Sequence, residues 1–395
     1  MKNSLKLILI ILACFIGVFA FNSNPFEKVP TPDQPIIDYT SEFGWKSMHY
    51  YNQLDDEAKK AYEIMYATVK NLDEKCTLKI DDETLANVFT AVLYDNPEIF
   101  WMKTDYKYYS YGNKVVFKPN YIYSESEVTQ YSVELNNKIQ EIINQASFCV
   151  TDYEKELFFH DYICKNTVYD METFGNVGAS VHNTFINGRA VCEGYSRAMQ
   201  ILLDKSGIYN YLIIGDGTSD GKTEPHMWNV VKLNNENYHL DVTWNDNDES
   251  GDISYVYFNV TDEQVSRDHS NFEPKENNCY GTYFNYSVRN GTYVHTYYHF
   301  SQFSEASAKV LKTGRNTVEL CFKNKSDYDR AVSSISDNEE LFEYVNTSVK
   351  KSGRNLKTDS IEYYSDDDLQ YICIIFKEGW FLWIKKELKK HSEKF

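Results

Sequence analysis

Three residues of the chain have the types and the order that thiol-based acyl chemistry requires: Cys192, His226 and Asp241. In such chemistry a thiolate attacks a carbonyl carbon, an imidazole moves the proton, and a carboxylate orients the imidazole. From Cys192 to residue 205 the apolar side chains recur at helical spacing, so we expect the sulfur at the first turn of a helix. The free N–H groups and the positive dipole end there favour a thiolate, and the backbone N–H of Cys192 is placed to serve an oxyanion hole.

The histidine and the aspartate are expected on neighbouring strands of a sheet. Composition and turn signals predict strands over 211–214, 226–233 and 236–242, a Gly-, Ser- and Asp-rich loop over 215–225, and a two-residue turn at 234–235. If residue 233 pairs with residue 236, then His226 and Asp241 are diagonal neighbours with backbones roughly 7–8 Å apart. The carboxylate is then within reach of the imidazole and can accept its Nδ1–H. The spacing therefore predicts a Cys-His-Asp triad.

The segments around these residues resemble the three motifs of the transglutaminase-like superfamily. The motifs are Val191-Cys192-Glu193-Gly194-Tyr195, His226-Met227-Trp228-Asn229 and Leu240-Asp241-Val242-Thr243-Trp244. The resemblance implies a papain-like α+β core with Cys192 as nucleophile, His226 as base and Asp241 as the residue that orients it. The family includes transglutaminases, peptidases, peptide N-glycanases and inactive scaffolds, so the resemblance specifies the catalytic groups better than the substrate.

Further segments extend the resemblance upstream. Residues 160–162 and 168–170 resemble the helix that precedes the cysteine in bacterial members, and residues 95–101 resemble the amino-terminal region of exported members. Candidates for the substrate cleft are Trp228, Trp244, Tyr195 and Asn183. The two tryptophans are equally suited to a hydrophobic core. A second oxyanion donor is left open between Asn183 and His182.

The 395-residue chain is long enough for two or three domains. We predict an N-terminal α+β domain over 45–145, a transglutaminase-like core over 146–290 and a small α/β domain over 296–395. Further helices are expected over 55–70, 82–93, 126–143, 152–165, 327–335 and 338–349, the first two with N-caps at Asp55 and Asp82. Further strands are expected over 107–110, 114–117, 316–322, 360–364 and 371–376.

The amino terminus predicts export. Lys2 and Lys6 precede an apolar run over 7–21, which is typical of a signal peptide. Cleavage after Ala20, lipidation at Cys14 and retention as a membrane anchor all stay open. A Pro-rich linker follows over 22–44. We expect an exported protein, either secreted or anchored at the outer face of the cell membrane.

The composition restricts the partners. The formal charge is 40 − 58 = −18, which disfavours nucleic acid and anionic lipid, so membrane contact is expected only through the N-terminal segment. The eight cysteines form no CxxC pair and no zinc-type cluster, so we expect neither a metal nor a cofactor, while disulfide pairing stays open. The expected partner is a peptide or protein substrate, with cell-envelope peptide as one candidate.

The sequence thus predicts an exported cysteine-dependent acyl transferase or hydrolase. A peptidase or amidase that forms a thioester is the first reading. A protein-crosslinking transglutaminase is the second, because only the nucleophile that resolves the thioester differs. A non-catalytic binding module on the same fold is the third, and an intact triad argues against it.

Overall fold

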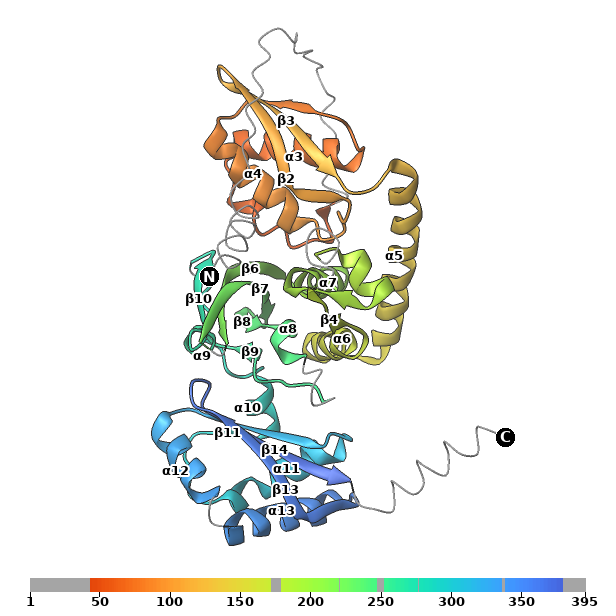
Figure 1. The fold of residues 1–395 in the computed structure, drawn as a ribbon. Helices are drawn as coiled ribbons and strands as arrows, with labels where there is room; N and C mark the ends of the chain where they lie inside the picture. The colour runs from red at the N-terminus through yellow and green to blue at the C-terminus, as the bar shows by residue number, and fades with distance from the viewer. Residues whose placement is uncertain are drawn as a thin grey trace, which may run out of the picture.

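The computed structural model describes residues 43–171, 179–219, 221–246, 252–275, 277–335 and 338–378. The leader predicted over 1–21 and nearly all of the linker predicted over 22–44 lie outside the described residues. None of the helices in the described ranges is long and apolar enough to cross a membrane. The fold is α+β, as predicted, and its helices and sheets form three successive parts along the chain (Figure 1).

The first part packs two helices against a three-stranded antiparallel sheet of order β1-β3-β2. The Asp55 side chain caps α3, as predicted, but α4 is capped by Asp81, so the N-cap predicted at Asp82 is wrong by one residue. The strands predicted over 107–110 and 114–117 are confirmed, and they form a hairpin in which Tyr111 pairs with Lys114 across the turn. The elements are η1 (Tyr51–Gln53), α3 (Asp56–Lys70), β1 (Cys76–Leu78), α4 (Asp82–Asp95), β2 (Met102–Tyr111) and β3 (Lys114–Tyr121).

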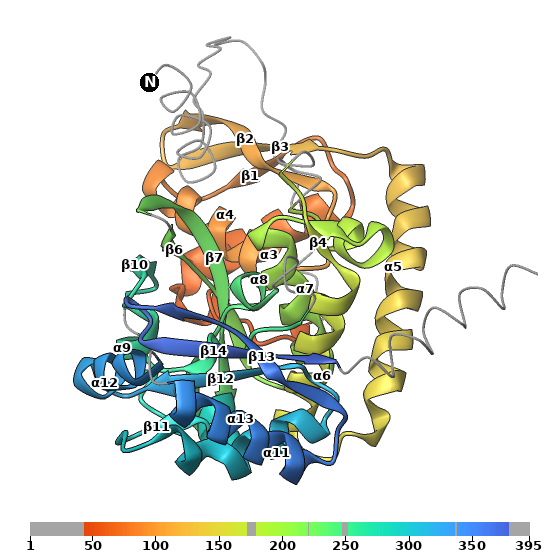
Figure 2. The same ribbon diagram turned by 60° about the horizontal axis from the view of Figure 1, so that its bottom comes forward.

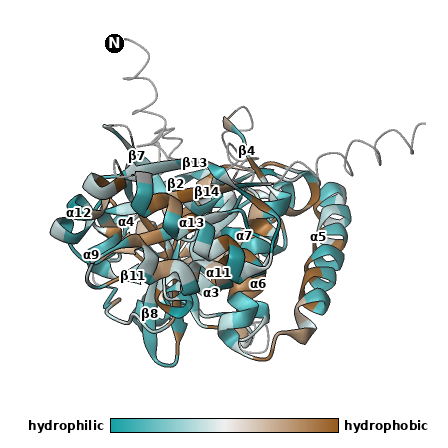
Figure 3. Ribbon diagram, turned by 90° about the horizontal axis from the view of Figure 1, so that it is seen from below, coloured by the Kyte–Doolittle hydropathy of each residue, from teal (hydrophilic) through white to brown (hydrophobic). Residues whose placement is uncertain are grey.

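A long helix, α5 (Glu125–Gln145), connects this part to the next and runs along its flank (Figures 1 and 2). A capping box between Ser124 and Glu127 fixes its first turn. Its buried side chains recur at helical spacing on one side only. Figure 3 shows that α5 and α12, at opposite rims of the molecule, are largely hydrophilic, which suits helices that bury one face.

The second part is built on a five-stranded antiparallel sheet of order β10-β6-β7-β8-β9. Helix α7 packs against β6 and β7, and α6 packs against α7 (Figure 1). The sheet comprises β6 (Asn210–Ser219), β7 (Lys222–Leu233), β8 (Glu236–Leu240), β9 (Phe258–Val260) and β10 (His269–Glu273). The remaining elements are η2 (Ala146–Phe148), α6 (Asp152–Asn166), β4 (Val168–Tyr169), η4 (Asn183–Asn187), β5 (Arg189–Ala190), α7 (Cys192–Lys205), α8 (Val242–Asn245) and α9 (Asp262–Val265).

The turn between β7 and β8 has the predicted register. Leu233 pairs with Glu236, and Asn234 and Asn235 adopt φ values of 49° and 65°, the left-handed conformation that a two-residue hairpin turn needs. The loop predicted over 215–225 is wrong, because most of it continues the β6–β7 ladder out to Ser219 and Lys222. Its glycines suggested a loop, but Gly215 and Gly217 serve packing within β6. A Cβ on Gly217, for example, would lie 2.6 Å from the ring of Trp244.

The third part is a mixed sheet of order β11-β12-β14-β13 with helices packed on it. The predicted strands and helices of this region are present, whereas α11 was not expected. The elements are α10 (Tyr286–Asn290), β11 (Tyr293–Val294), η5 (Phe300–Phe303), α11 (Ser304–Lys312), β12 (Thr317–Phe322), α12 (Lys325–Ile335), α13 (Asn338–Ser352), β13 (Leu356–Asp366) and β14 (Tyr371–Glu378).

The hydrophobic cores do not follow the predicted domain boundaries one for one. Buried side chains on both sides of residue 145 form one cluster that runs from Met48 to Tyr286. A second cluster, from Val294 to Phe376, belongs to the third part alone. The boundaries over 45–145, 146–290 and 296–395 therefore stay predictions. The seven cysteines of the described ranges are all free.

The third part is attached to the second through the segment 252–257. Glu319 in β12 accepts hydrogen bonds from Ser254 Oγ at 2.5 Å and from the backbone N–H of Tyr255 at 2.9 Å. The guanidinium of Arg315 donates to the carbonyl oxygen of Ile253 at 2.7 Å and lies 4.3 Å from the Tyr255 ring. These contacts fix the chain between α8 and β9.

Glu156 in α6 supplies a test of this buried core. The side chain is fully buried, accepts a hydrogen bond from Asn259 Nδ2 at 2.8 Å, and has its pKa raised to about 8 by burial. Between the unfolded pKa of about 4.5 and the folded value, the folded state binds more protons, so stability should fall as pH rises. We predict that Glu156→Gln melts about 2 °C or more above the natural protein at pH 8.

The same difference should vanish at about pH 3, below the unfolded pKa, where Glu156 is protonated in both states. Thermal unfolding followed by circular dichroism at both pH values checks this. A melting difference that does not depend on pH would contradict the assignment.

Candidate active site

Cys192 is the first residue of α7 and is half-buried. No described side chain caps this helix, so the N–H groups of its first turn face the sulfur without competition from a capping group. Ser196 Oγ lies 2.9 Å from the carbonyl oxygen of Cys192 and 2.8 Å from that of Met227. Asn229 Nδ2 donates to the carbonyl oxygen of Ser196 at 3.0 Å. The start of α7 is thereby joined to β7, the strand that carries His226.

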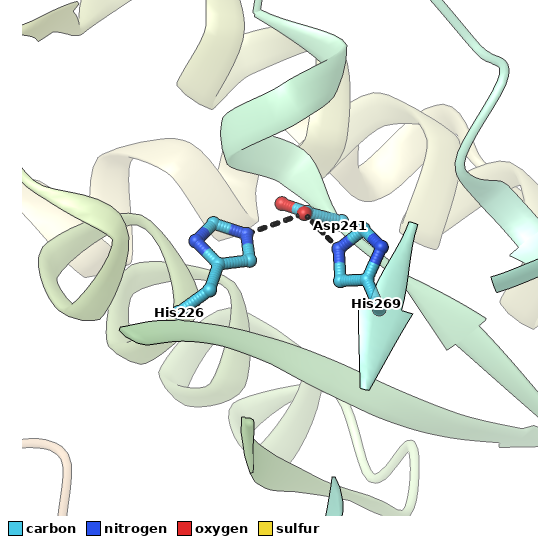
Figure 4. A group of neighbouring side chains, drawn as sticks. All are labelled: His226, Asp241 and His269. Atoms are coloured by element: carbon cyan, nitrogen blue, oxygen red, sulfur yellow. Dashed lines mark hydrogen bonds and ion pairs between the residues drawn. The ribbon is translucent and has the colours of Figure 1, made fainter. Parts of the chain in front are cut away.

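His226 and Asp241 form a close buried pair. Asp241 follows β8 and caps α8 by accepting the backbone N–H of Trp244 at 3.1 Å. His226 Nε2 lies 2.6 Å from Asp241 Oδ2 (Figure 4). We expected the Nδ1–H to make this contact, and that prediction is wrong. The carboxylate lies beyond the end of β8, so it meets the ring nitrogen farther from the strand, and Nδ1 is left for other partners.

The opposite charges of His226 and Asp241 keep both groups ionised, although burial disfavours the ionised form of each. Burial alone would lower the pKa of His226, but the Asp241 carboxylate and a hydrogen bond with Cys192 raise it to about 10. Burial alone would raise the pKa of Asp241, but His226 and His269 hold it well below its usual range. The structure therefore brings Cys192, His226 and Asp241 together, with the imidazole between the sulfur and the carboxylate.

Of the four residues predicted for the substrate cleft, two are core residues. Trp228 is fully buried, and its Nε1–H donates to His239 Nδ1 at 3.0 Å. Tyr195 is also fully buried, and its hydroxyl donates to Asp246 at 2.6 Å. Neither side chain exposes a surface to a substrate, so both residues belong to the core that supports the site.

Trp244 is the predicted cleft residue that is both half-exposed and in contact with the triad. Its ring centroid lies 5.0 Å from that of His226, and its far edge packs over Gly217. A side chain larger than hydrogen at Gly217 would displace this ring. Trp244 is therefore the aromatic wall beside the imidazole.

The two candidates for a second oxyanion donor have other partners. Asn183 is buried in the π-helical turn η4, where its Nδ2 donates to the carbonyl oxygen of Arg189 and its Oδ1 accepts from Asn187 at 2.7 Å. His182 stacks on Phe100 at 5.3 Å between ring centroids. These side chains build the segment that leads to Cys192, and neither makes a contact with the sulfur that we observe.

Sequence reasoning missed two residues near the triad. His269, the first residue of β10, places its Nε2 3.2 Å from Asp241 Oδ2 (Figure 4). Tyr169 in β4 pairs with Ala190, two residues before Cys192, and burial together with Cys192 raises the pKa of its hydroxyl. The motif at 168–170 pointed to Tyr169 without assigning it a role. No local spacing pointed to His269, because only the pairing of β10 with β6 brings it to Asp241.

Two groups of described residues combine ligand types that metals use: His226, Asp241 and His269, and His239, Asp262 and Cys279. In the first group, a separation of 2.6 Å between His226 Nε2 and Asp241 Oδ2 is a hydrogen bond and leaves no space for an ion between these atoms. In the second, His239 Nε2 lies 2.8 Å from Asp262 Oδ1, while its Nδ1 accepts from Trp228. In both groups a histidine N–H donates a hydrogen bond to the aspartate, so neither arrangement requires an ion.

Comparison with known proteins identifies this part of the chain. Residues 140–242, which include Cys192, His226 and Asp241, match the family model of the transglutaminase-like superfamily. The recognition made from the motifs is thereby confirmed for this segment. No curated protein matches the chain.

Two solved structures are similar to the chain. One, described as a TGase, is 15% identical over 43% of this chain and 50% of that one, with a TM-score of 0.25. The other, a protease candidate from Parabacteroides distasonis, is 10% identical over 34% of this chain and 35% of that one, with a TM-score of 0.23. The chain thus spans half or less of the length of these two structures.

The electrostatics of the pair give a test that needs no substrate. We predict that His226 stays protonated until the pH approaches about 10. Asp241→Asn removes the carboxylate charge that most stabilises the His226 imidazolium. Burial should then bring the pKa of His226 near or below about 6.5. NMR titration of histidine-labelled protein measures both values.

Asp262→Asn is the matched control, since it removes a carboxylate from a neighbouring buried histidine, His239. It should leave the titration of His226 unchanged. An equal response of His226 to both substitutions would contradict the pairing.

Proposed function

We propose that the transglutaminase-like core is the active site of a cysteine-dependent enzyme that acts on peptide or carboxamide bonds. The observation that carries the proposal is the hydrogen-bonded array of Cys192, His226 and Asp241 at the uncapped start of α7. A sulfur with an imidazolium neighbour is activated as a thiolate, and a carboxylate that fixes the imidazole is the third member of such sites.

The reaction begins when the Cys192 thiolate attacks the carbonyl carbon and the carbonyl electron pair moves onto the oxygen. The backbone N–H of Cys192 stabilises this oxyanion. As the tetrahedral intermediate collapses, the C–N bond breaks, and the imidazolium of His226 gives its proton to the departing amine or ammonia. A thioester on Cys192 remains, with His226 neutral.

A second nucleophile then resolves the thioester. His226 takes its proton, the nucleophile attacks the thioester carbon, and the C–S bond breaks to restore the thiolate and the imidazolium. Water makes the protein a peptidase or amidase, which is our first proposal. A primary amine makes it a protein-crosslinking transglutaminase, the second candidate, which shares every step up to the thioester.

The remaining parts of the proposal concern the cellular location of the protein and its substrate. The N-terminal leader motif supports action outside the cell membrane, and a peptide of the cell envelope or a surface protein is the proposed substrate. A purely binding role would not need the buried ion pair between His226 and Asp241, since such a pair is costly unless its charges are used or compensated.

Alkylation of the thiol is the first test. We predict that iodoacetamide labels Cys192 at least about tenfold faster than Cys149 at pH 6, because His226 supplies Cys192 with an imidazolium partner. Cys149 is the matched control, since it is also half-buried but has its pKa raised by burial. Peptide mass spectrometry measures both rates. Equal rates would refute the activated thiolate.

Turnover is the second arm of the same test. Natural protein and Cys192→Ala are incubated with glutamine-containing peptides, with and without a fluorescent primary amine. Cleavage or deamidation of the peptide identifies a hydrolase, and incorporation of the amine identifies a transglutaminase. Both products should be absent from Cys192→Ala, and equal yield from the variant would contradict the proposed mechanism.

A further inference from the structure

His269 is a buried histidine with a carboxylate at each ring nitrogen. Its Nε2 lies 3.2 Å from Asp241 Oδ2, and its Nδ1 lies 2.6 Å from Asp268 Oδ1. The side chain is completely buried, and the side chains of Asp241 and Asp268 are 1% and 9% exposed. Water therefore does not replace either contact.

The protonation of this ring follows from its partners. An ionised carboxylate only accepts hydrogen bonds, so each nitrogen that faces one must carry a proton. A neutral imidazole has a single N–H and would leave one nitrogen lone pair against a carboxylate. Two carboxylate neighbours thus select the imidazolium, and they raise the pKa of His269 although burial alone would lower it.

The charged and titratable groups around His269 come from five elements or the residues next to them. Asp241 precedes α8, Asp268 precedes β10, and His226 lies in β7, with a ring centroid 5.5 Å from that of His269. Tyr257, just before β9, donates its hydroxyl to the second oxygen of Asp268. In β8, burial and the charge of His269 lower the pKa of His239, although Asp262 opposes this shift. Charges of alternating sign therefore run from His226 through Asp241 and His269 to Asp268.

The rings of two tryptophans exclude water from this chain of groups. The centroid of His269 lies 4.4 Å from that of Trp244 and 4.8 Å from that of Trp228. In such a site a charge interacts strongly with its neighbours, and an unpaired charge is costly.

We propose that His269 is a positioning residue which, as an imidazolium held by Asp268, fixes Asp241 for its contact with His226. The inference deepens the proposed function, on which its kinetic readout at Cys192 rests. His269 touches no reacting atom. It supplies Asp241 with a third donor, besides His226 and the backbone N–H of Trp244. Without it, the carboxylate loses a fixed orientation and part of the positive charge around it.

Two substitutions in the full chain separate charge from packing. His269→Gln keeps approximate volume but removes the charge and the donor that fix Asp241, so His226 is less well placed against the sulfur and the alkylation rate of Cys192 should fall about tenfold at both pH 6 and pH 9. Asp268→Asn keeps an acceptor for the Nδ1–H but removes its charge, so His269 should lose its proton at lower pH. That variant should label normally at pH 6 and about tenfold slower at pH 9.

His49→Gln is the matched control, a half-buried histidine stacked on Tyr211 at 3.6 Å between ring centroids, with no contact to Asp241 that we observe. Its rates should equal those of the natural protein. A purely structural role for His269 would give Asp268→Asn the same defect at both pH values, and this result would overturn the proposal. Natural rates at both pH values in either His269→Gln or Asp268→Asn would also overturn it.

A direct measurement distinguishes failure of this inference from failure of the proposed function. Nitrogen NMR of histidine-labelled protein, assigned by the signal lost in His269→Gln, should show both ring nitrogens of His269 protonated at pH 8. If Cys192 proves unreactive while His269 is doubly protonated, the proposed function fails and the imidazolium stands. A neutral His269 overturns the inference whatever the reactivity of Cys192.

Discussion

The structure depends on one buried negative charge, the carboxylate of Asp241. A carboxylate that is 1% exposed is stable in its ionised form only if several donors surround it. Here the donors are His226 Nε2–H, His269 Nε2–H and the backbone N–H of Trp244. They come from β7, β10 and the first turn of α8. The strand order β10-β6-β7-β8 is what gathers these distant segments around one oxygen pair.

The position of the sulfur follows from the same sheet. Helix α7 packs on β6 and β7, and the contacts of Ser196 with Met227 and Asn229 join its first turn to the strand of His226. The backbone of Cys192 therefore cannot move relative to β7 without breaking buried hydrogen bonds. Buried bonds of this kind are costly to leave unmade, so the geometry is held before any substrate arrives.

Sequence reasoning succeeded where the determinants are local. The Asn234-Asn235 turn fixes the β7–β8 register, and the apolar spacing fixes α7, so the meeting of Cys192, His226 and Asp241 could be predicted. It failed where contacts are made by chain segments far apart. Gly215 and Gly217, which looked like part of a loop, pack against tryptophan rings, and the imidazole nitrogen that meets Asp241 depends on where β8 ends. His269 reaches the site only through a pairing between β6 and β10, which no local pattern encodes.

The attachment of the third part bears on whether the second part, which carries the candidate site, can be separated from it. Glu319 and Arg315 hold the segment 252–257, and Tyr257 at its end accepts the backbone N–H of Asp241 and donates to Asp268. Truncation before Arg315 would remove the hydrogen bonds of Arg315 and Glu319 to that segment and so weaken the support of both acidic residues of the site. The last hundred residues therefore are not an interchangeable appendage. In the natural chain they support the candidate site through Glu319 and Arg315. An exchange of this region between proteins would have to preserve these two side chains.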